Sequence, residues 1–333
     1  MLGAMLSRML GRGQGSDELL PLAIDRVVAA TDARLSLLPG YRKALTPGMK
    51  ISLAYVESLA DQFRDDLDLS LRAFTLDRRL GLFFSSPASL LALLRKNQPL
   101  QDFFHCASNG EDAYALLLMQ RSHSLRFGVA NQDGAIISDV AQTVVSFDHH
   151  RLMLPCPSRE ALRLSSPRRG LDLLATVIAR RLALLEQERS GAERDLARIR
   201  MRLSVLANPG SVLIDAMAPD EALPQGREAL LQRQSELQQR LVELRSLAEL
   251  SGILEQVSQM LAHPQEYLRV EPLALYLDRM GVVQEGVAAQ EATMVSVEEV
   301  QLGPGHAVRR VVLPVHVSLD AIRELELCVA ADG

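Results

Sequence analysis

The sequence predicts an α+β protein with a helical N-terminal region, an antiparallel β platform, and a long antiparallel coiled-coil hairpin inserted between the β segments of that platform. Three observations support this fold class. Apolar residues recur at helical spacing through 17–107, short β-branched runs separated by turn residues follow in 108–169, and leucine heptads fill 170–262. Strand patterning returns in 263–333, so the heptad region interrupts the platform in sequence. Residues 1–16 precede these parts as a flexible leader.

The leader consists of Met/Leu pairs interrupted by arginine, followed by the glycine-rich stretch Gly11–Ser16. It is too short for a secretory signal peptide and lacks the small-residue cleavage site. We therefore expect a flexible leader, and the alternative is a helix in weak contact with a membrane surface. No uninterrupted apolar run of the chain reaches the length that spans a bilayer.

Breaks and capping residues divide the N-terminal region into several helices. Leu38-Pro39-Gly40 interrupts the first helical pattern. Thr46-Pro47 and Ser86-Pro87 each place a hydroxyl side chain just before a proline, the arrangement expected for an N-cap and the first helical residue. We therefore expect new helices to begin at Pro47 and at Pro87.

The first part of the β platform contains short apolar and β-branched runs. The runs are Ala113–Arg121, Ser124–Ala130 and Ala135–Phe147, and the turn-rich stretch 131–134 separates the last two. Arg151–Leu154 extends the last strand or adds another. We expect an antiparallel meander of about three to five strands.

The heptad region gives the strongest pattern in the sequence. Positions spaced by threes and fours along this region are apolar, with Arg189 as the one polar exception. They are Leu174, Ile178, Leu182, Leu185, Arg189, Ala192, Leu196, Ile199, Leu203 and Leu206. The stepping resumes after a break and shifts register near Leu247, as a stutter does. The two predicted helices, 170–207 and 227–262, are each roughly 54 Å long at 1.5 Å per residue. Their similar lengths and short connection favour an intramolecular antiparallel hairpin.

The second part of the platform has three predicted strands, at Tyr267–Leu277, Thr293–Leu302 and Ala307–Leu319. Pro314 lacks a backbone N–H, so we expect its strand to be an edge strand or to be bulged. An antiparallel hairpin brings the two ends of 170–262 together. We therefore expect the strands before and after it to share one sheet.

Composition limits the classes of function. The chain has 36 basic and 41 acidic residues, a net charge of −5 and a pI near 5.9, which argues against a general nucleic-acid-binding surface. Arginine supplies nearly all of the basic charge, which is typical of coding bias in a GC-rich, bacterial genome. The three cysteines form no CxxC pair and no disulfide framework, so a reducing cytoplasm is the expected location.

One triplet has the residue types of a metal centre. Asp148-His149-His150 directly follows an apolar strand that ends at Phe147, and it resembles the triplet of the DHH phosphoesterases. The resemblance covers these three residues and implies a metal site for hydrolysis. That family also takes acidic ligands from an upstream D-x-D motif on a parallel α/β scaffold, whereas the upstream region here has a helical pattern. The favoured interpretation is a polar strand end, and we expect no catalytic residue and no cofactor.

Two features of the hairpin are candidates for binding a partner. The tip, near 208–225, carries an apolar cluster that includes Val212, Leu213, Ile214 and Met217, and exposed clusters of that kind often mark interaction sites. The alternative is a small cap buried against the helix ends. Arg194, Arg198 and Arg202 recur at i, i+4 and i+8. Such a stripe can contact phosphates, but interspersed acidic residues favour an ordinary solvated face.

These observations favour a non-enzymatic cytosolic scaffold or adaptor that binds a protein partner or associates with itself through the coiled-coil stalk. Long coiled coils provide reach and pairing specificity, and no set of converging polar groups is apparent. One alternative is a metal-dependent hydrolase or phosphoesterase centred on Asp148, His149 and His150. Another is a nucleic-acid-associated stalk protein that uses Arg194, Arg198 and Arg202, although nucleic acid is not the expected partner.

Overall fold

The structure, a computed structural model, describes residues 16–63, 66–106, 108–132, 135–207, 224, 226–284, 292–306 and 308–331. The chain forms two compact units. The sheet unit contains Ser52–Leu173 and the segment from Pro264 onward, and the helical unit contains Leu20–Ile51 and Leu174–His263. No helix in the described ranges combines the length and apolar character needed to cross a bilayer.

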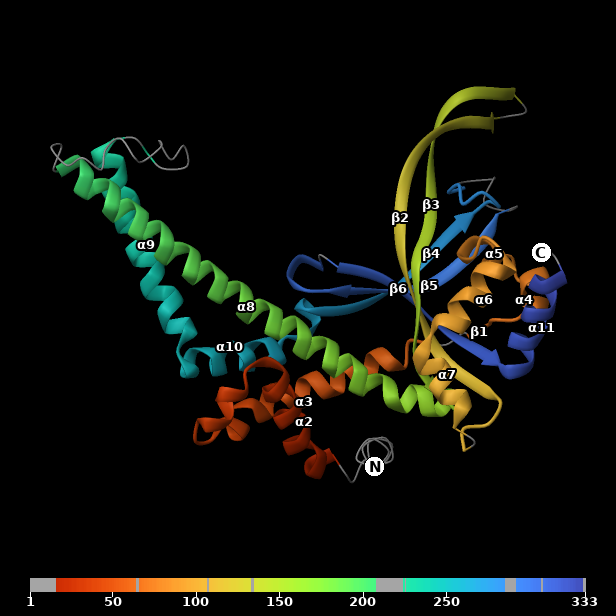
Figure 1. Ribbon diagram of the computed structural model, residues 1–333, viewed down its shortest axis with the longest axis horizontal. Coiled ribbons are helices and arrows are strands. Elements are labelled where there is room, and N and C mark those ends of the chain that lie inside the picture. The colour runs from red at the N-terminus through yellow and green to blue at the C-terminus, as the bar shows by residue number, and fades with distance from the viewer. Residues whose placement is uncertain are drawn as a thin grey trace. The chain divides into compact units, whose positions relative to one another are not determined.

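One sheet organises the sheet unit, as predicted. Its strands lie in the order β3–β2–β6–β5–β4 with antiparallel pairing, and a short β1 pairs with β6 in parallel. The bounds are β1 Leu67–Asp68, β2 Asp112–Gln132, β3 Ala135–Cys156, β4 Leu268–Leu277, β5 Thr293–Leu302 and β6 Val308–Ser318. Since β2 lies beside β6, strands from both sides of the inserted helices meet in one sheet (Figure 1). The α+β class and the insertion between β segments are confirmed.

Helices cover one face of this sheet (Figure 1). They are α4 (Leu71–Leu76), α5 (Arg78–Phe83), α6 (Pro87–Lys96), α7 (Gln98–His105) and α11 (Leu319–Ala331). Their apolar side chains form one core with alternate residues of the strands, including Leu90, Leu117, Val295, Val315 and Leu325. Alternation places every second strand residue on the same face, which is why the core side of β2 is Ala113, Ala115, Leu117 and Met119.

The opposite face of the sheet meets the end of α3 (Tyr41–Ala60) and the start of α8 (Arg159–Ala207) within the same unit. The Tyr55 hydroxyl donates to the Leu268 carbonyl over 2.8 Å. Gly170 lies so close to Val56 that an added Cβ would stand 3.2 Å from that side chain. A small apolar cavity of about 150 Å³ remains between these helices and the strands.

The predicted meander of three to five strands is wrong, because 112–156 forms one hairpin of two very long strands. Three bulges interrupt β3, and each contains one residue with positive φ: Asp139 at 61°, His149 at 55° and Leu154 at 56°. A bulge inserts an extra residue, which reverses the inward and outward alternation and bends the strand. These local reversals of the period-two pattern looked like strand ends in the sequence.

Three further expectations need correction. β6 is an inner strand, and Pro314 is tolerated there because pairing to β5 ends at Val312 and pairing to β1 begins only at Val315. Helix α11 was not predicted, although the Ser318 hydroxyl caps it by accepting from the Ala321 N–H over 3.1 Å. Pro47 lies inside α3 and does not begin it. The Thr46 hydroxyl donates back to the Arg42 carbonyl over 2.7 Å, as a mid-helix threonine does.

The Ser86-Pro87 expectation is confirmed. Ser86 and Ser89 form a reciprocal capping box at the start of α6, with each side chain accepting from the other residue's backbone N–H.

The helical unit combines N-terminal helices with the inserted hairpin. Its elements are α2 (Ser16–Thr31), the 3₁₀ helix η1 (Ala33–Leu37), the first part of α3, most of α8, α9 (Arg227–Ala248) and α10 (Leu250–Ala262). Ile24, Leu35, Leu45 and Met49 are fully buried. Gly48 permits a close approach of α3 to α10, since a Cβ there would lie 2.8 Å from the Ser258 carbonyl oxygen.

The hairpin itself departs from its predicted bounds in two ways. Helix α8 begins at Arg159, ahead of the expected 170, and Pro167 lies within it. The second predicted helix, 227–262, is two helices separated at Glu249. The break falls two residues after Leu247, where the heptad register shifts. The sequence pattern therefore located the irregularity, and the structure shows that it is a helix break.

Candidate functional site

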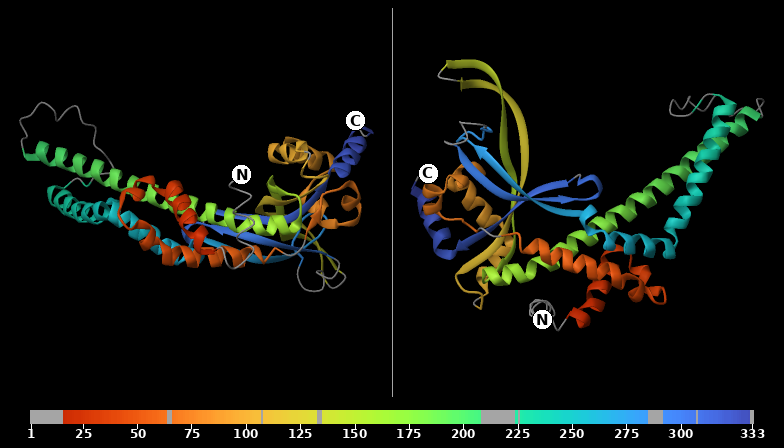
Figure 2. Two further views of the ribbon diagram at one scale, coloured as in Figure 1. Left: turned by 90° about the horizontal axis from the view of Figure 1, so that it is seen from below. Right: turned by 180° about the vertical axis from the view of Figure 1, so that it is seen from behind.

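The outer half of the hairpin is closed by its own leucines. Ala192, Leu196, Ile199 and Leu203 of α8 pack against α9 residues that follow the same heptad stepping, namely Leu230, Leu237 and Leu241. Helix α9 runs back beside α8 in both views of the hairpin (Figures 1 and 2). The heptad positions in this half therefore satisfy one another.

The inner half of the hairpin is not closed in this way. A groove of about 750 Å³ lies where α9 ends and α10 begins. It is lined by α8, by α9 and α10, and by η1. Leu182, Leu185 and Leu247 occupy heptad positions yet remain only half-buried along this groove. We refer to this surface as the hairpin groove, and it contains Ala179, Leu182, Leu185, Leu244, Leu247, Ala248 and Ile253 among its lining residues.

Charged residues form the rim of the hairpin groove. Arg189, the polar exception in the heptads, contacts Glu186 and lies 3.0 Å from Glu193. Its guanidinium, which donates to Glu186, holds the pKa of that carboxyl below its usual range. On η1, the hydrogen bonds from Arg34 lower the pKa of Asp32 in the same way. The rim thus carries both signs of charge, including the ion pairs Arg34–Asp32 and Arg189–Glu186.

The arginine stripe lies on α8 as predicted from its spacing. Arg194 and Arg198 are exposed and Arg202 is half-exposed. Arg194 donates to the Ser190 carbonyl over 3.2 Å, and Arg198 lies 3.8 Å from Asp195. Local contacts therefore engage two of the three side chains. The predicted tip residues, Val212, Leu213, Ile214 and Met217, lie outside the described residues.

The Asp148-His149-His150 triplet is the middle bulge of β3. His149, with positive φ, is the extra residue, so His150 returns to the side of the sheet on which Phe147 is buried. The His150 ring stacks on Phe84, with centroids 4.7 Å apart and planes inclined by 29°. Asp148 and His149 are exposed, and the Ser146 hydroxyl donates to Asp148 over 3.3 Å.

The three side chains of the triplet thus have separate environments. Within the described ranges, no group of three or more His, Cys, Asp or Glu side chains is arranged to hold a metal ion. The D-x-D ligands of the phosphoesterases that the triplet resembles also require a parallel α/β scaffold, whereas this triplet lies in an antiparallel hairpin.

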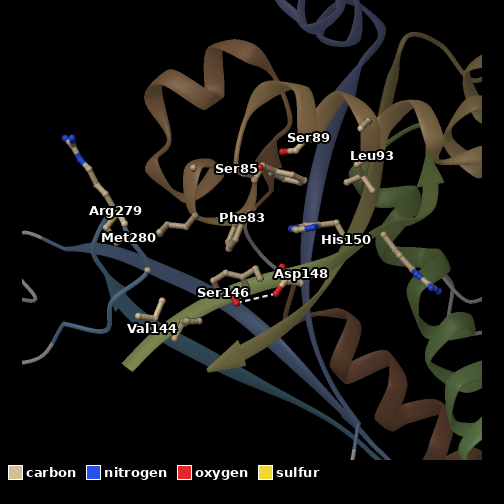
Figure 3. A pocket seen from close by; sticks show the side chains of 18 of the residues that line it. Phe83, Ser85, Ser89, Leu93, Val144, Ser146, Asp148, His150, Arg279 and Met280 are labelled. Carbon is tan, nitrogen blue, oxygen red and sulfur yellow. Dashed lines mark hydrogen bonds between the residues drawn. The ribbon is translucent and has the colours of Figure 1, made fainter. Parts of the chain in front are cut away.

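A pocket of about 790 Å³ lies beside the triplet, between β3 on one side and α5 and α6 on the other (Figure 3). Its floor is aromatic, because Phe83 meets Phe147 edge to face at 5.0 Å and Phe84 meets His150. The loop that follows β4 closes one end, where the Val145 N–H donates to the Gly281 carbonyl over 2.8 Å. We refer to this cavity as the β3 pocket.

His150 has an unusual environment in the β3 pocket. Burial lowers its pKa, against the raising effects of a hydrogen bond to the Phe83 backbone and of the Asp148 charge. Its Nε2 atom is buried and has no hydrogen-bond partner among the described residues. The ring is therefore neutral at pH 7 and keeps one unsatisfied nitrogen.

Comparison of the chain with protein families, characterised proteins and solved structures found no match.

Sequence reasoning found the triplet but not the pocket beside it. The pocket depends on a bulge, on the α5–α6 connection and on the loop around Gly281, three segments that are far apart in sequence. The hairpin groove could have been found in part, because the register shift at Leu247 and the polar residue Arg189 both lie beside it.

Proposed function

We propose that this protein is a non-enzymatic scaffold or adaptor that holds a protein partner through its helical hairpin, with the hairpin groove as the docking surface. The observation that carries the proposal is the half-buried state of Leu182, Leu185 and Leu247. Leucines at heptad positions pack as knobs between the side chains of a facing helix. Here α8 and α9–α10 separate, so the facing positions in the groove are vacant.

The occupant that fits is an amphipathic helix of a partner protein. A groove between two helices, apolar at its base and charged at its rim, accepts a helix whose apolar residues recur at i, i+3 and i+7. The outer half of the hairpin shows that heptad leucines of this chain pack helix against helix. A third helix in the groove would complete the coiled-coil packing that the sequence predicts for the whole hairpin.

A reducing compartment suits this role. Cys106, Cys156 and Cys328 form no disulfide with one another, as expected for a cytoplasmic protein. We therefore propose the cytoplasm as the location.

The test is affinity purification from the native host with a groove variant and a matched control. Leu185→Glu/Leu247→Glu places two charges in the groove. Leu184→Glu/Val242→Glu places the same charges on hairpin residues that are 41% and 69% exposed and do not line the groove. We expect wild type and control to retain one partner at defined stoichiometry and the groove variant to lose it. Circular dichroism checks that all three proteins fold.

A second copy of the chain is one form of this partner. In that case light scattering on the purified protein gives twice the monomer mass for wild type and control, and the monomer mass for the groove variant. Retention of every partner by the groove variant, or the absence of any stoichiometric partner of wild type, contradicts the proposal.

A further inference from the structure

The β3 pocket has a strong imbalance of charge. Four basic side chains border it, Lys96, Arg126, Arg151 and Arg279, against one acidic side chain, Asp148. In the part of the chain that the structure describes, none of the four has a carboxylate within ion-pair distance. The imbalance is notable in a chain whose net charge is −5.

Some arginines elsewhere in the protein contact two carboxylates each. Arg163 contacts both Glu160 and Asp61, and Arg240 contacts both Glu243 and Glu188. Basic residues bordering one cavity without carboxylate partners create a positive potential in that cavity, and an anion is the ligand that such a potential attracts.

The basic residues lie toward two ends of the pocket. Arg126 pairs with Gln142 in the hairpin, two residues from Val144, and Arg279 lies close to Gly281, which bonds to Val145. Arg151 and Lys96 belong to the other end, where the Asn97 amide donates to the Leu152 carbonyl. At roughly 3.3 Å per residue along β3, the ends are about 20 Å apart. An anionic group can bind at either end while the rest of the ligand covers the lining between the two ends.

The apolar part of the lining adds a second requirement. Phe83, Phe84 and Phe147 are almost fully buried, so the accessible apolar surface of the pocket comes from side chains such as Leu93, Val144 and Met280 (Figure 3). These partly exposed side chains suit the apolar body of a ligand. The Nε2 atom of His150 is buried and takes no part in this surface.

We propose that the β3 pocket binds a small organic anion with an apolar body, such as a phosphorylated or carboxylated aromatic compound. This site is independent of the hairpin groove, because all of its lining residues belong to the sheet unit. It adds a small-molecule ligand to a protein whose proposed partner is another protein.

The test uses 8-anilinonaphthalene-1-sulfonate, which combines an anion, an aromatic body and an N–H donor and fluoresces when bound. Lys96→Glu/Arg151→Glu reverses one end of the pocket. Arg269→Glu/Arg323→Glu makes the same change of charge at exposed residues outside it. We expect the pocket variant to raise the Kd about tenfold and the control to leave it within twofold.

Competition identifies the anionic group. Adenosine 5′-monophosphate and salicylate each carry an aromatic body, a donor and an anion, whereas adenosine lacks the anion. We expect one of the two anions to displace the dye and adenosine to leave it bound. Equal dye binding by wild type and pocket variant, displacement by adenosine, or displacement by neither anion overturns the proposal. A melting curve of each variant confirms that it is folded.

Discussion

The imidazole of His150 stacks on the ring of Phe84 at 4.7 Å, and this contact exists because the bulge at His149 turns His150 to the core side of β3. Two residues of one sequence triplet thus have different structural roles. His149 supplies the backbone conformation, and His150 supplies a buried ring beside a pocket.

The buried ring of His150 should make the stability of the protein sensitive to pH. Burial lowers the pKa of His150 in the folded state, while Asp148 raises it and His149 lowers it further. As the pH falls below the unfolded value, near 6.5, the unfolded chain binds a proton that the folded protein resists. Stability is therefore full above pH 6.5 and declines as the pH falls toward the folded pKa. Urea unfolding at pH 7.5 and pH 5.5 should show a smaller decline for His150→Phe than for wild type. An identical decline would contradict this role of His150.

The positive φ of His149 predicts opposite effects of two substitutions. Glycine adopts this conformation without steric cost, so His149→Gly should stabilise the protein by about 0.5 kcal/mol after the entropy of the unfolded chain is subtracted. A β-branched residue is strained there, and His149→Val should destabilise it by about 1–2 kcal/mol. Thermal unfolding measures both. As a control, Asp148→Gly should destabilise, because Asp148 has no positive φ. Destabilisation by His149→Gly would argue against the bulge.

A nearly buried ion pair crosses the sheet from β2 to β5. Arg121 lies 2.8 Å from Glu299, and the side chains are 13% and 7% exposed. Removing one partner leaves a charge in a poorly solvated position, which is costly, whereas replacing both with apolar residues is often tolerated. Arg121→Met should therefore destabilise by about 2–3 kcal/mol, and Arg121→Met/Glu299→Leu should recover most of that loss. A double variant that is less stable than the single variant would contradict this prediction. Urea denaturation of all four proteins measures the cycle.

The carboxyl of Glu298 should also make the stability of the protein depend on pH, in the direction opposite to that of His150. Its Oε2 atom is buried and has no hydrogen-bond partner in the described part of the chain, and burial raises the pKa of this carboxyl. Because the pKa of Glu298 is higher in the folded state than in the unfolded state, the protein is most stable below the unfolded-state pKa. That stability is lost as the pH rises through the folded-state pKa. Glu298→Gln, which carries no charge, should stabilise the protein at pH 7.5 by about 0.5–1 kcal/mol. Thermal unfolding at pH 7.5 and pH 4 should show that the gain shrinks at the lower pH. A gain that is independent of pH would rule out ionisation as its cause.

Sequence patterning succeeded where one local rule controls the structure. Heptad spacing predicted the inserted helical hairpin, and period-two patterning predicted β4, β5 and β6 closely. The Ser86-Pro87 capping signal predicted the start of α6. It also followed from the hairpin that strands on both sides would share one sheet, which the β2–β6 pairing confirms.

Sequence patterning failed where contacts between distant segments override the local rule. The bulges of β3 made one long strand look like several short ones in the sequence. Pro314 is tolerated within β6 because it lies between the segment that pairs with β5 and the segment that pairs with β1. The β3 pocket needed three distant segments, so no local pattern could reveal it. The hairpin groove is intermediate. Its leucines were recognised as heptad residues, but only the break at Glu249 shows that some of them lack a facing helix.

Site-specific photocrosslinking can show whether the hairpin groove receives a helix. A benzophenone amino acid would replace Leu247 in the groove or, as the control, Val242 on the exposed face of α9. After irradiation in the native host, mass spectrometry would locate the crosslinked residues. We predict that position 247, and not position 242, crosslinks to one protein at apolar residues spaced by three and four along a helix. The same crosslinks from both positions, or none from position 247, would show that the groove does not receive a helix.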